Sequence, residues 1–265
     1  MDLLVEVCQI QGRGLKGNQK KLSYAMEDSC KGASVVAGKF NNLKLVKNVK
    51  SALYKIMLRH RSTERLFADY YKTNFWRDSD SKSGTGSNLK QTAELREALP
   101  GLFSKYGINS ILDLPCGDFF WFSKIQINKN IVYTGADIVA GIVEDNNIKY
   151  GKDCFQFIQL DLTKGPLPTA DLIITRDCLV HLSFKHIRLA IQNIKKSKSQ
   201  YLLATHFTCR KANYDITTGG WRPLSLTLKP FNFPEPIEII VEKCTEGDGI
   251  FEDKCMALWR IKDLL

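Results

Sequence analysis

The stretch Ile111-Leu112-Asp113-Leu114-Pro115-Cys116-Gly117-Asp118-Phe119-Phe120-Trp121 decides the fold of this chain. A short apolar run that ends in an acid, followed by a tight turn and a second acid, is typical of a strand, a sharp turn and a helix start. Gly117 has no Cβ, so the backbone can approach a ligand closely, and a helix beginning at Asp118 would point free N–H groups into the same crevice. The pattern predicts the first cofactor-binding turn of a doubly wound α/β sheet.

Acids also close the next predicted strands. The strand over 131–138 ends at Asp137, about 24 residues beyond Asp113, which is near the spacing at which such an acid reaches ribose hydroxyls in a nucleotide-binding unit. The strand over 155–162 ends at Asp161. Because parallel strands deliver their carboxyl ends to one edge, we expect these carboxylates to gather in a single crevice.

The remaining pattern completes an α/β domain. Helices are predicted over 89–106, over 139–150 and up to about residue 198, and further strands over 170–177, 200–207, 237–243 and 255–261. The connection over 208–236 is long for a plain loop, and long loops beyond a strand's carboxyl end usually bind something.

The N-terminal part differs from this domain in composition. Residues 1–38 are predicted to form a poorly ordered basic leader, residues 39–82 a helical cap, and residues 83–265 the main domain. The cap contains an amphipathic basic helix over 42–60 and a second helix capped by Ser62 or Thr63. The Ser- and Gly-rich segment 79–88 is either a passive connector or a loop that folds over the crevice.

Composition limits the function. The chain has 265 residues and a net charge of +10, but most of the excess Lys and Arg precedes about Lys82, so a nucleic-acid partner is not expected. Its eight cysteines form no C-x-x-C pair and no metal-ligand spacing, which fits a reducing compartment and no metal site. Neither a signal peptide nor an apolar run of membrane-spanning length is visible, so we expect a cytoplasmic protein. The sequence does not indicate an oligomeric state.

The motifs resemble those of the class I S-adenosylmethionine-dependent methyltransferases. Asp113-Leu114-Pro115-Cys116-Gly117-Asp118 is similar to the first motif of that family, and Arg176-Asp177 to its fourth-strand motif. The run from about Tyr70 onward also resembles a bacterial-type branch with R-D-C-L-V-H-L and W-R-P-L segments. The resemblance implies a Rossmann-like sheet of seven strands with the last strand antiparallel, and S-adenosylmethionine as cofactor. Pro115 stands where the broad class has glycine.

The resemblance also implies how the cofactor is held. Asp137 would accept both ribose hydroxyls, the pair Asp161-Leu162 would contact the adenine, and the glycine turn would hold the methionine end. Trp76 and Arg96 would close that end, unless they serve only surface packing and helix solubility. The expected cofactor-binding residues are Trp76, Arg96, Asp113, Pro115, Cys116, Gly117, Asp118, Asp137, Ile138, Asp161, Leu162 and Arg176.

A hydroxyl acceptor must lose its proton during transfer, so a base is needed. Asp177 and His181 follow the fourth strand and are the candidate catalytic residues, with His206 on the next strand as a rival. We expect His206, Tyr214, Trp221 and Arg222 to contact the acceptor, a small molecule or a glycan.

Two other functions stay open. A nicotinamide-dependent oxidoreductase shares the acid on the second strand, but the three-glycine turn of that class is missing here. A non-catalytic module that binds the cofactor is the other alternative.

Overall fold

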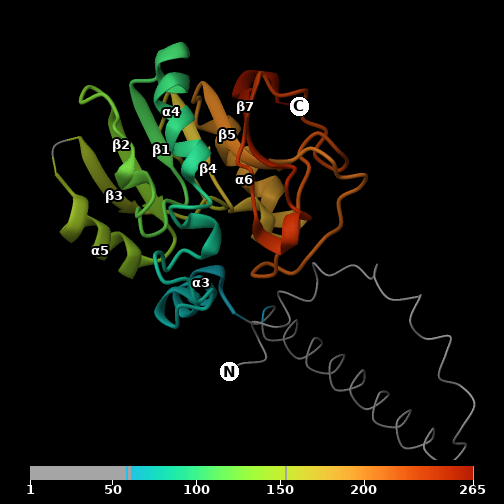
Figure 1. Cartoon of the computed structure of the whole chain (residues 1–265), viewed down its shortest axis with the longest axis horizontal. Coiled ribbons are helices and arrows are strands. Elements are labelled where there is room, and N and C mark those ends of the chain that lie inside the picture. The colour runs from blue at the N-terminus through green and yellow to red at the C-terminus, as the bar shows by residue number, and fades with distance from the viewer. Residues whose placement is uncertain (1–57, 59–60, 153, 265) are drawn as a thin grey trace, which may run out of the picture. The chain divides into compact units, whose positions relative to one another are not determined.

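A seven-stranded sheet forms the centre of the structure, a computed structural model that describes residues 58, 61–152 and 154–264 (Figure 1). Its strands are β1 (Ser110–Asp113), β2 (Val132–Asp137), β3 (Phe155–Gln159), β4 (Leu172–Thr175), β5 (Tyr201–Phe207), β6 (Glu238–Val241) and β7 (Lys254–Arg260). They lie in the order β3-β2-β1-β4-β5-β7-β6, and β7 runs antiparallel to both of its neighbours. The predicted sheet with a reversed last strand is confirmed.

Helices cover both faces of this sheet. They are α3 (Thr63–Lys72), α4 (Ala93–Lys105), α5 (Ala140–Tyr150) and α6 (Phe184–Lys196). The predicted cap of α3 is confirmed, because the Arg65 N–H donates to the Ser62 side chain at 3.3 Å. Side chains of α4 and α5 pack with one apolar cluster, whereas α6 and the residues Leu224, Leu226, Phe231 and Phe233 of the long connection pack with the other.

The predicted helix at Asp118 is wrong. Residues 114–121 form turns, and only a short 3-10 helix follows at Phe122–Lys124. Phe119 has a left-handed backbone with φ 56°, which an α-helix does not accommodate. Its ring lies 5.0 Å from Tyr133 and 5.1 Å from Phe157, so these aromatic residues fill the core beneath β2 and β3. Packing of large rings therefore outweighs the local helix signal.

The direction of the strand order reverses in the middle of the sheet. β1 pairs with β2 on one side and with β4 on the other, so the connections leave β1 in opposite directions. Ligands of open α/β sheets bind at the carboxyl ends of the strands at such a reversal. Asp113 ends β1 at this point, opposite Gly135 of β2 and Ile174 of β4.

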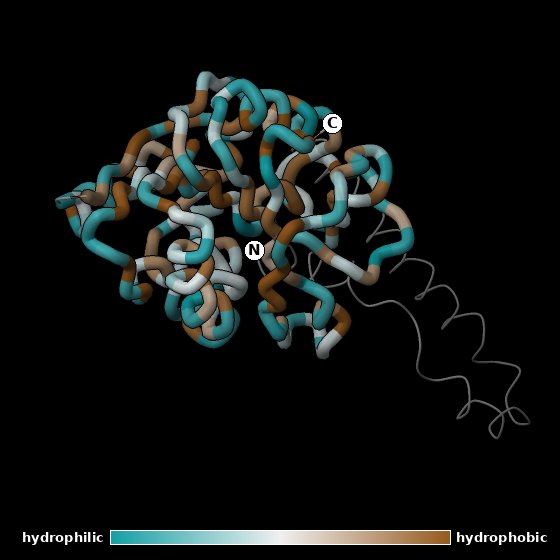
Figure 2. Tube along the Cα trace, turned by 90° about the horizontal axis from the view of Figure 1, so that it is seen from above, coloured by the Kyte–Doolittle hydropathy of each residue, from teal (hydrophilic) through white to brown (hydrophobic). Residues whose placement is uncertain are grey.

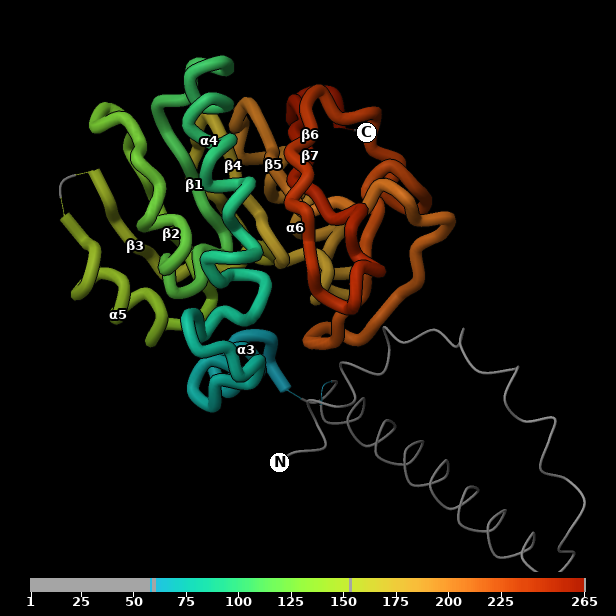
Figure 3. Tube along the Cα trace, viewed as in Figure 1, coloured from blue at the N-terminus to red at the C-terminus, as the bar shows by residue number. Residues whose placement is uncertain are grey.

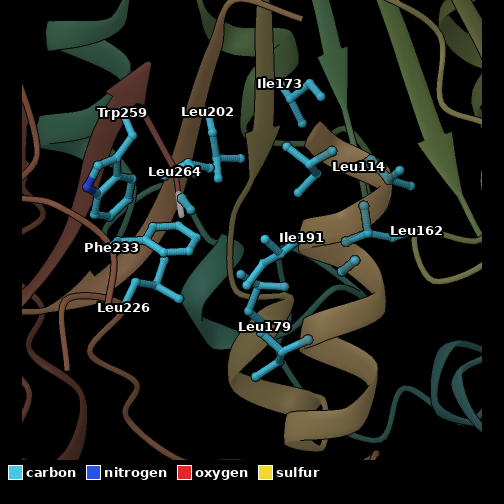
Figure 4. Packing of buried hydrophobic residues seen from close by; sticks show 14 of the residues in the cluster. Leu114, Leu162, Ile173, Leu179, Ile191, Leu202, Leu226, Phe233, Trp259 and Leu264 are labelled. Carbon is cyan, nitrogen blue, oxygen red and sulfur yellow. The ribbon is translucent and has the colours of Figure 1, made fainter. Parts of the chain in front are cut away.

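The larger apolar cluster lies between the sheet and α6. Leu202, Ile187 and Trp259 are almost fully buried in it, and Leu226 and Phe233 bring the long connection onto the same face (Figure 4). The tube in Figure 2 shows brown, hydrophobic stretches in the interior among teal, hydrophilic loops. Both faces of the sheet are thus closed by apolar packing, as a mostly parallel sheet requires.

Residues 62–265 form one compact unit, which begins after Arg61. Residues 62–82 therefore belong to the same unit as the sheet. The predicted leader over 1–38 lies outside the described residues, as does the predicted helix over 42–60 apart from residue 58. In the part of the chain that the structure describes, no helix is both long and apolar enough to cross a membrane.

Stability of the sheet should depend on its central strands. Leu202 of β5 is fully buried, so Leu202→Ala should lower the free energy of unfolding by about 2–5 kcal/mol, measured by urea denaturation. Leu189 of α6 is 36% exposed, so Leu189→Ala is a matched control that should change this free energy by less than about 1 kcal/mol. Equal losses in both variants would contradict this placement of the core.

Candidate functional site

The glycine turn after β1 is held from both sides by hydrogen bonds. The Gly117 N–H donates to the Asp137 carboxylate at 3.2 Å, and the Cys116 N–H donates to the Ala136 carbonyl at 2.8 Å. From α5, the buried Asn146 side chain donates to the Gly117 carbonyl at 2.7 Å. Gly117 itself has φ 54°, a conformation that favours glycine. The turn is thus fixed against the ends of β2 and α5.

Two buried acids lie at this edge of the sheet. Asp113 accepts a hydrogen bond of 2.6 Å from the Tyr133 hydroxyl, and burial raises the pKa of Asp113 to about 7. Asp137 accepts from the N–H groups of Gly117 and Val139, and burial raises its pKa to about 6 despite these bonds. Perturbed, buried carboxyl groups gathered at a sheet edge are typical of a functional site.

The acid after β3 is placed differently. Asp161 accepts hydrogen bonds from the N–H and hydroxyl of Thr163 and pairs with Lys164 at 3.1 Å. Burial raises the pKa of Asp161, but these hydrogen bonds and the lysine outweigh it and lower the pKa overall. The next residue, Leu162, is buried, and the Ile138 carbonyl after β2 accepts from the Gln159 side chain. Asp161 is thus an ionised carboxylate on the loop after β3.

The segment 79–88 packs on the glycine turn. Asp118 accepts hydrogen bonds from the Ser81 hydroxyl and the Lys82 N–H, each at 2.9 Å, and its own N–H donates to the Ser83 hydroxyl. A Cβ added to Gly117 would lie only 2.3 Å from that hydroxyl oxygen. Figure 3 shows this segment between α3 and α4. Of the two sequence interpretations, a passive connector does not describe these contacts, because the segment covers the turn.

Trp76 and Arg96 have different surroundings. A Cβ added to Gly84 of the covering segment would lie 3.1 Å from the Trp76 ring, and that ring lies 5.9 Å from His181. Trp76 therefore lies against both the covering segment and His181. Arg96 instead donates to the Leu89 carbonyl and the Thr92 hydroxyl, both in the turn that precedes its own helix.

A buried charge network lies beyond β4. The Arg176 guanidinium pairs with Glu242 at 2.5 Å and with Asp177 at 3.3 Å, and it donates to the Gly86 carbonyl at 2.7 Å. The Lys254 ammonium pairs with Asp177 at 2.7 Å. Arg176 thus connects β4 to the covering segment rather than lying free in the crevice.

Asp177 is a poor candidate for the base. Burial raises its pKa, but the Lys254 and Arg176 charges outweigh burial and hold the pKa well below its usual range. A carboxylate that stays ionised this strongly does not accept a proton at neutral pH. Its geometry favours an electrostatic and structural role over the catalytic role expected from the sequence.

His181 has the geometry of a base. Its Nδ1 lies 2.7 Å from the Gly220 carbonyl oxygen, which can only accept, so Nδ1 carries the hydrogen and Nε2 keeps a lone pair. Among the described residues no group hydrogen-bonds to Nε2. Burial lowers the pKa of His181 despite the bond to Gly220, so the ring is neutral at pH 7.

His206 is placed as a structural residue. It is buried, its Nδ1 accepts a hydrogen bond of 3.0 Å from the Leu226 N–H, and its ring packs edge-on against Trp259. The Nδ1 lone pair is therefore used, and burial lowers the pKa to about 4. This environment does not support the rival assignment of His206 as the base.

The other residues expected at the acceptor differ in their contacts and burial. Trp221 packs against Phe207 and Phe251, and Tyr214 is 50% exposed. Arg222 is fully buried and donates to the Leu179 and Val180 carbonyls. Arg222 therefore contacts backbone, and its expected contact with an acceptor is not available in this conformation.

Sequence reasoning missed several polar residues of this edge. These are Ser81, Asn146, Glu242, Glu246 and Lys254. Glu242 pairs with Arg176, and Lys254 with Asp177, only because β7 and β6 follow β5 in the sheet, which no local pattern encodes. Among the described residues, no cluster of His, Cys, Asp and Glu has the arrangement of a metal site.

Comparisons with known proteins concern the fold alone. No known family model matches the sequence, and no curated protein matches it. The N-methyltransferase NodS from Bradyrhizobium japonicum WM9, in complex with S-adenosyl-l-homocysteine, is 16% identical over 72% of this chain and 97% of that chain, with a TM-score of 0.52. Magnesium protoporphyrin IX methyltransferase (ChlM) from Synechocystis PCC 6803, with bound SAM, is 11% identical over 76% and 97% of the two chains, with a TM-score of 0.47. The NodS comparison shows that this chain has the Rossmann-like methyltransferase fold.

Burial of Asp113 should make stability depend on pH. Its folded pKa of about 7 exceeds the ordinary 3.8, so the folded protein should lose stability as the pH rises from about 4 to about 7. Asparagine does not titrate but can still accept from Tyr133. Relative to wild type, Asp113→Asn should therefore gain about 1–4 kcal/mol in unfolding free energy between pH 4.5 and pH 8. Urea denaturation at both pH values measures this, with Asp263→Asn as the exposed control, and an unchanged difference would contradict the buried, protonated acid.

Proposed function

We propose that this protein is an S-adenosylmethionine-dependent methyltransferase that acts on a hydroxyl group of a small molecule or glycan. The observation that carries the proposal is the contact between Gly117 and Asp137, which unites the turn expected at the methionine end with the acid expected at the ribose. Residues distant in sequence thereby form one edge, in the order that this cofactor requires. The fold shared with NodS, whose structure contains S-adenosyl-l-homocysteine, supports the same cofactor.

The residues present fit this cofactor. Asp137 receives two backbone N–H donors, and its carboxylate oxygens retain lone pairs that can accept ribose hydroxyls. Its pKa of about 6 leaves it ionised at pH 7.5. Asp161 and Leu162 would read the adenine, and the turn at Gly117 would receive the methionine end. Because Ser83 lies against Gly117, the covering segment must shift or join the site when the cofactor binds.

The cofactor supplies an electrophilic methyl group on a sulfonium, so the protein mainly aligns donor and acceptor and controls one proton. His181 presents an unprotonated Nε2 and would accept the proton of the acceptor hydroxyl. The Asp177 carboxylate raises the pKa of His181 and would stabilise the imidazolium that forms. Lys254 and Arg176 keep Asp177 ionised for this role.

The surroundings of His181 favour an acceptor with a ring. Phe67 lies 6.4 Å and Trp76 5.9 Å from the imidazole, measured between ring centroids. Aromatic faces suit the apolar faces of sugars and other rings. Phe67 lies in α3 and Trp76 lies between α3 and the covering segment 79–88. The part of the chain before β1 would therefore contribute to acceptor recognition, while the covering segment lies over the cofactor.

Cofactor binding should depend on the acid of β2. Wild-type protein should bind S-adenosylhomocysteine in a calorimetric titration, and Asp137→Ala should weaken binding by about tenfold or more, because two hydrogen bonds of about 0.5–1.5 kcal/mol each are lost. Asp263→Ala, an exposed acid near the C-terminus, is the matched control and should bind like wild type. Tight NADH binding with no response to S-adenosylhomocysteine would refute the proposed cofactor.

The covering segment should respond to the cofactor. Lys82 is an exposed trypsin site within it, and its N–H is held by Asp118. Asp118→Ala removes the acceptor of several hydrogen bonds and should accelerate cleavage after Lys82 by about tenfold. Saturating S-adenosylhomocysteine should slow this cleavage in wild type. Mass spectrometry measures both effects on cleavage after Lys82, with cleavage after Lys211 as the internal control. Equal effects at both cleavage sites would contradict a specific response of the covering segment.

A further inference from the structure

We infer that Arg222 is a positioning residue, which holds the short helix Leu179–His181 so that His181 presents Nε2 to the crevice. Arg222 was expected to contact the acceptor, but its side chain is fully buried and reaches backbone carbonyls. This inference deepens the proposed function and rests on it, because it concerns the base of the proposed reaction.

The contacts form a clamp of residues 219–222 on this helix. The Arg222 guanidinium donates through Nη1 to the Val180 carbonyl at 3.0 Å and more weakly to the Leu179 carbonyl at 3.4 Å. The Arg222 backbone N–H also donates to the Val180 carbonyl, and the Gly219 N–H donates to the His181 carbonyl at 2.8 Å. Each carbonyl of the helix thus accepts from the clamp.

Burying the charged guanidinium of Arg222 costs free energy. Among the described residues no carboxylate lies within ion-pair distance of it, and its Nε and Nη2 have no hydrogen-bond partner there. Burial lowers the pKa of Arg222 to about 10. The ring of Phe184 below the guanidinium, at 5.3 Å, offers some compensation. An apolar side chain of similar size would fill this space at lower cost, so the bonds to the two carbonyls are what the arginine adds.

The same clamp sets the tautomer of His181. Gly220 lies between Gly219 and Arg222, and its carbonyl accepts a hydrogen bond of 2.7 Å from Nδ1 of His181. The Tyr70 hydroxyl donates to the neighbouring Gly219 carbonyl at 3.1 Å, which anchors the clamp to α3. If Arg222 released the helix, the imidazole and the Gly220 carbonyl would no longer keep this distance, and both tautomers would become populated.

Nitrogen-15 NMR of histidine-labelled protein tests the inference without a known acceptor. Wild type should show His181 as the Nδ1–H tautomer, and Arg222→Met should convert it to a mixture. Burial lowers the pKa of His181, the bond to Gly220 and the Asp177 charge raise it, and the Arg222 and Lys254 charges lower it more weakly. Because Arg222→Met loosens the bond to Gly220 as well as removing the Arg222 charge, the titration of His181 should move downward. Arg210→Met is the matched control, since Arg210 pairs with Asp253 and forms no hydrogen bond to residues 219–222 in the described part of the chain, and it should leave both readouts unchanged.

Outcomes separate positioning from simple packing. If Arg222 only fills space, Arg222→Met lowers the melting temperature but keeps the tautomer and the titration of His181. Should Arg222→Met fail to fold, Arg222→Lys serves instead, because one ammonium cannot reproduce the planar fork at both carbonyls. Either variant, folded and with wild-type His181 signals, overturns the inference, and so does a wild-type Nε2–H tautomer. S-adenosylhomocysteine affinity should stay within about twofold of wild type in each folded variant, and failure of wild type to bind it would refute the proposed function while leaving the tautomer result valid.

Discussion

The hydrogen bond from the Gly117 N–H to the Asp137 carboxylate is the contact on which the rest of the site depends. It joins the turn after β1 to the end of β2, so a buried acid is stabilised by the backbone that it positions. The remaining bonds support this one, because Asn146 fixes the same turn from α5 and the Val139 N–H holds the other carboxylate oxygen. If Asp137 binds a ribose as we propose, this preorganised contact would need little rearrangement.

The covering segment 79–88 forms a second layer over the glycine turn. It is fastened at one end by Asp118 and at the other by Arg176, whose charge is balanced within a buried network. These two contacts lie on either side of the strand-order reversal, so the segment bridges that reversal. Coupling between the network and this segment follows from Arg176, which contacts both Asp177 and the Gly86 carbonyl.

The sequence predicted the sheet correctly but only part of the arrangement at its edge. Strand ends such as Asp113 and Asp137 are readable because apolar runs and turn residues are local signals. The failed helix at Asp118 and the buried Arg222 have the opposite cause, since long-range packing decided both: aromatic rings beneath β2 in one case and the carbonyls of a distant helix in the other. The hydrogen bonding of the two histidines is likewise set by distant residues: His181 contacts Gly220, and His206 contacts Leu226. No local sequence pattern links these partners.

We propose that S-adenosylmethionine binds at the carboxyl ends of β1, β2 and β4, beside His181. A crystal structure of the protein grown with S-adenosylhomocysteine would locate the ligand. We expect ribose hydroxyls on Asp137, the methionine end at the Gly117 turn with Ser83 displaced or in contact with it, and the sulfur on the side of His181. Density for the ligand elsewhere, or an empty site with Ser83 still packed on Gly117 at saturating ligand, would contradict this proposal.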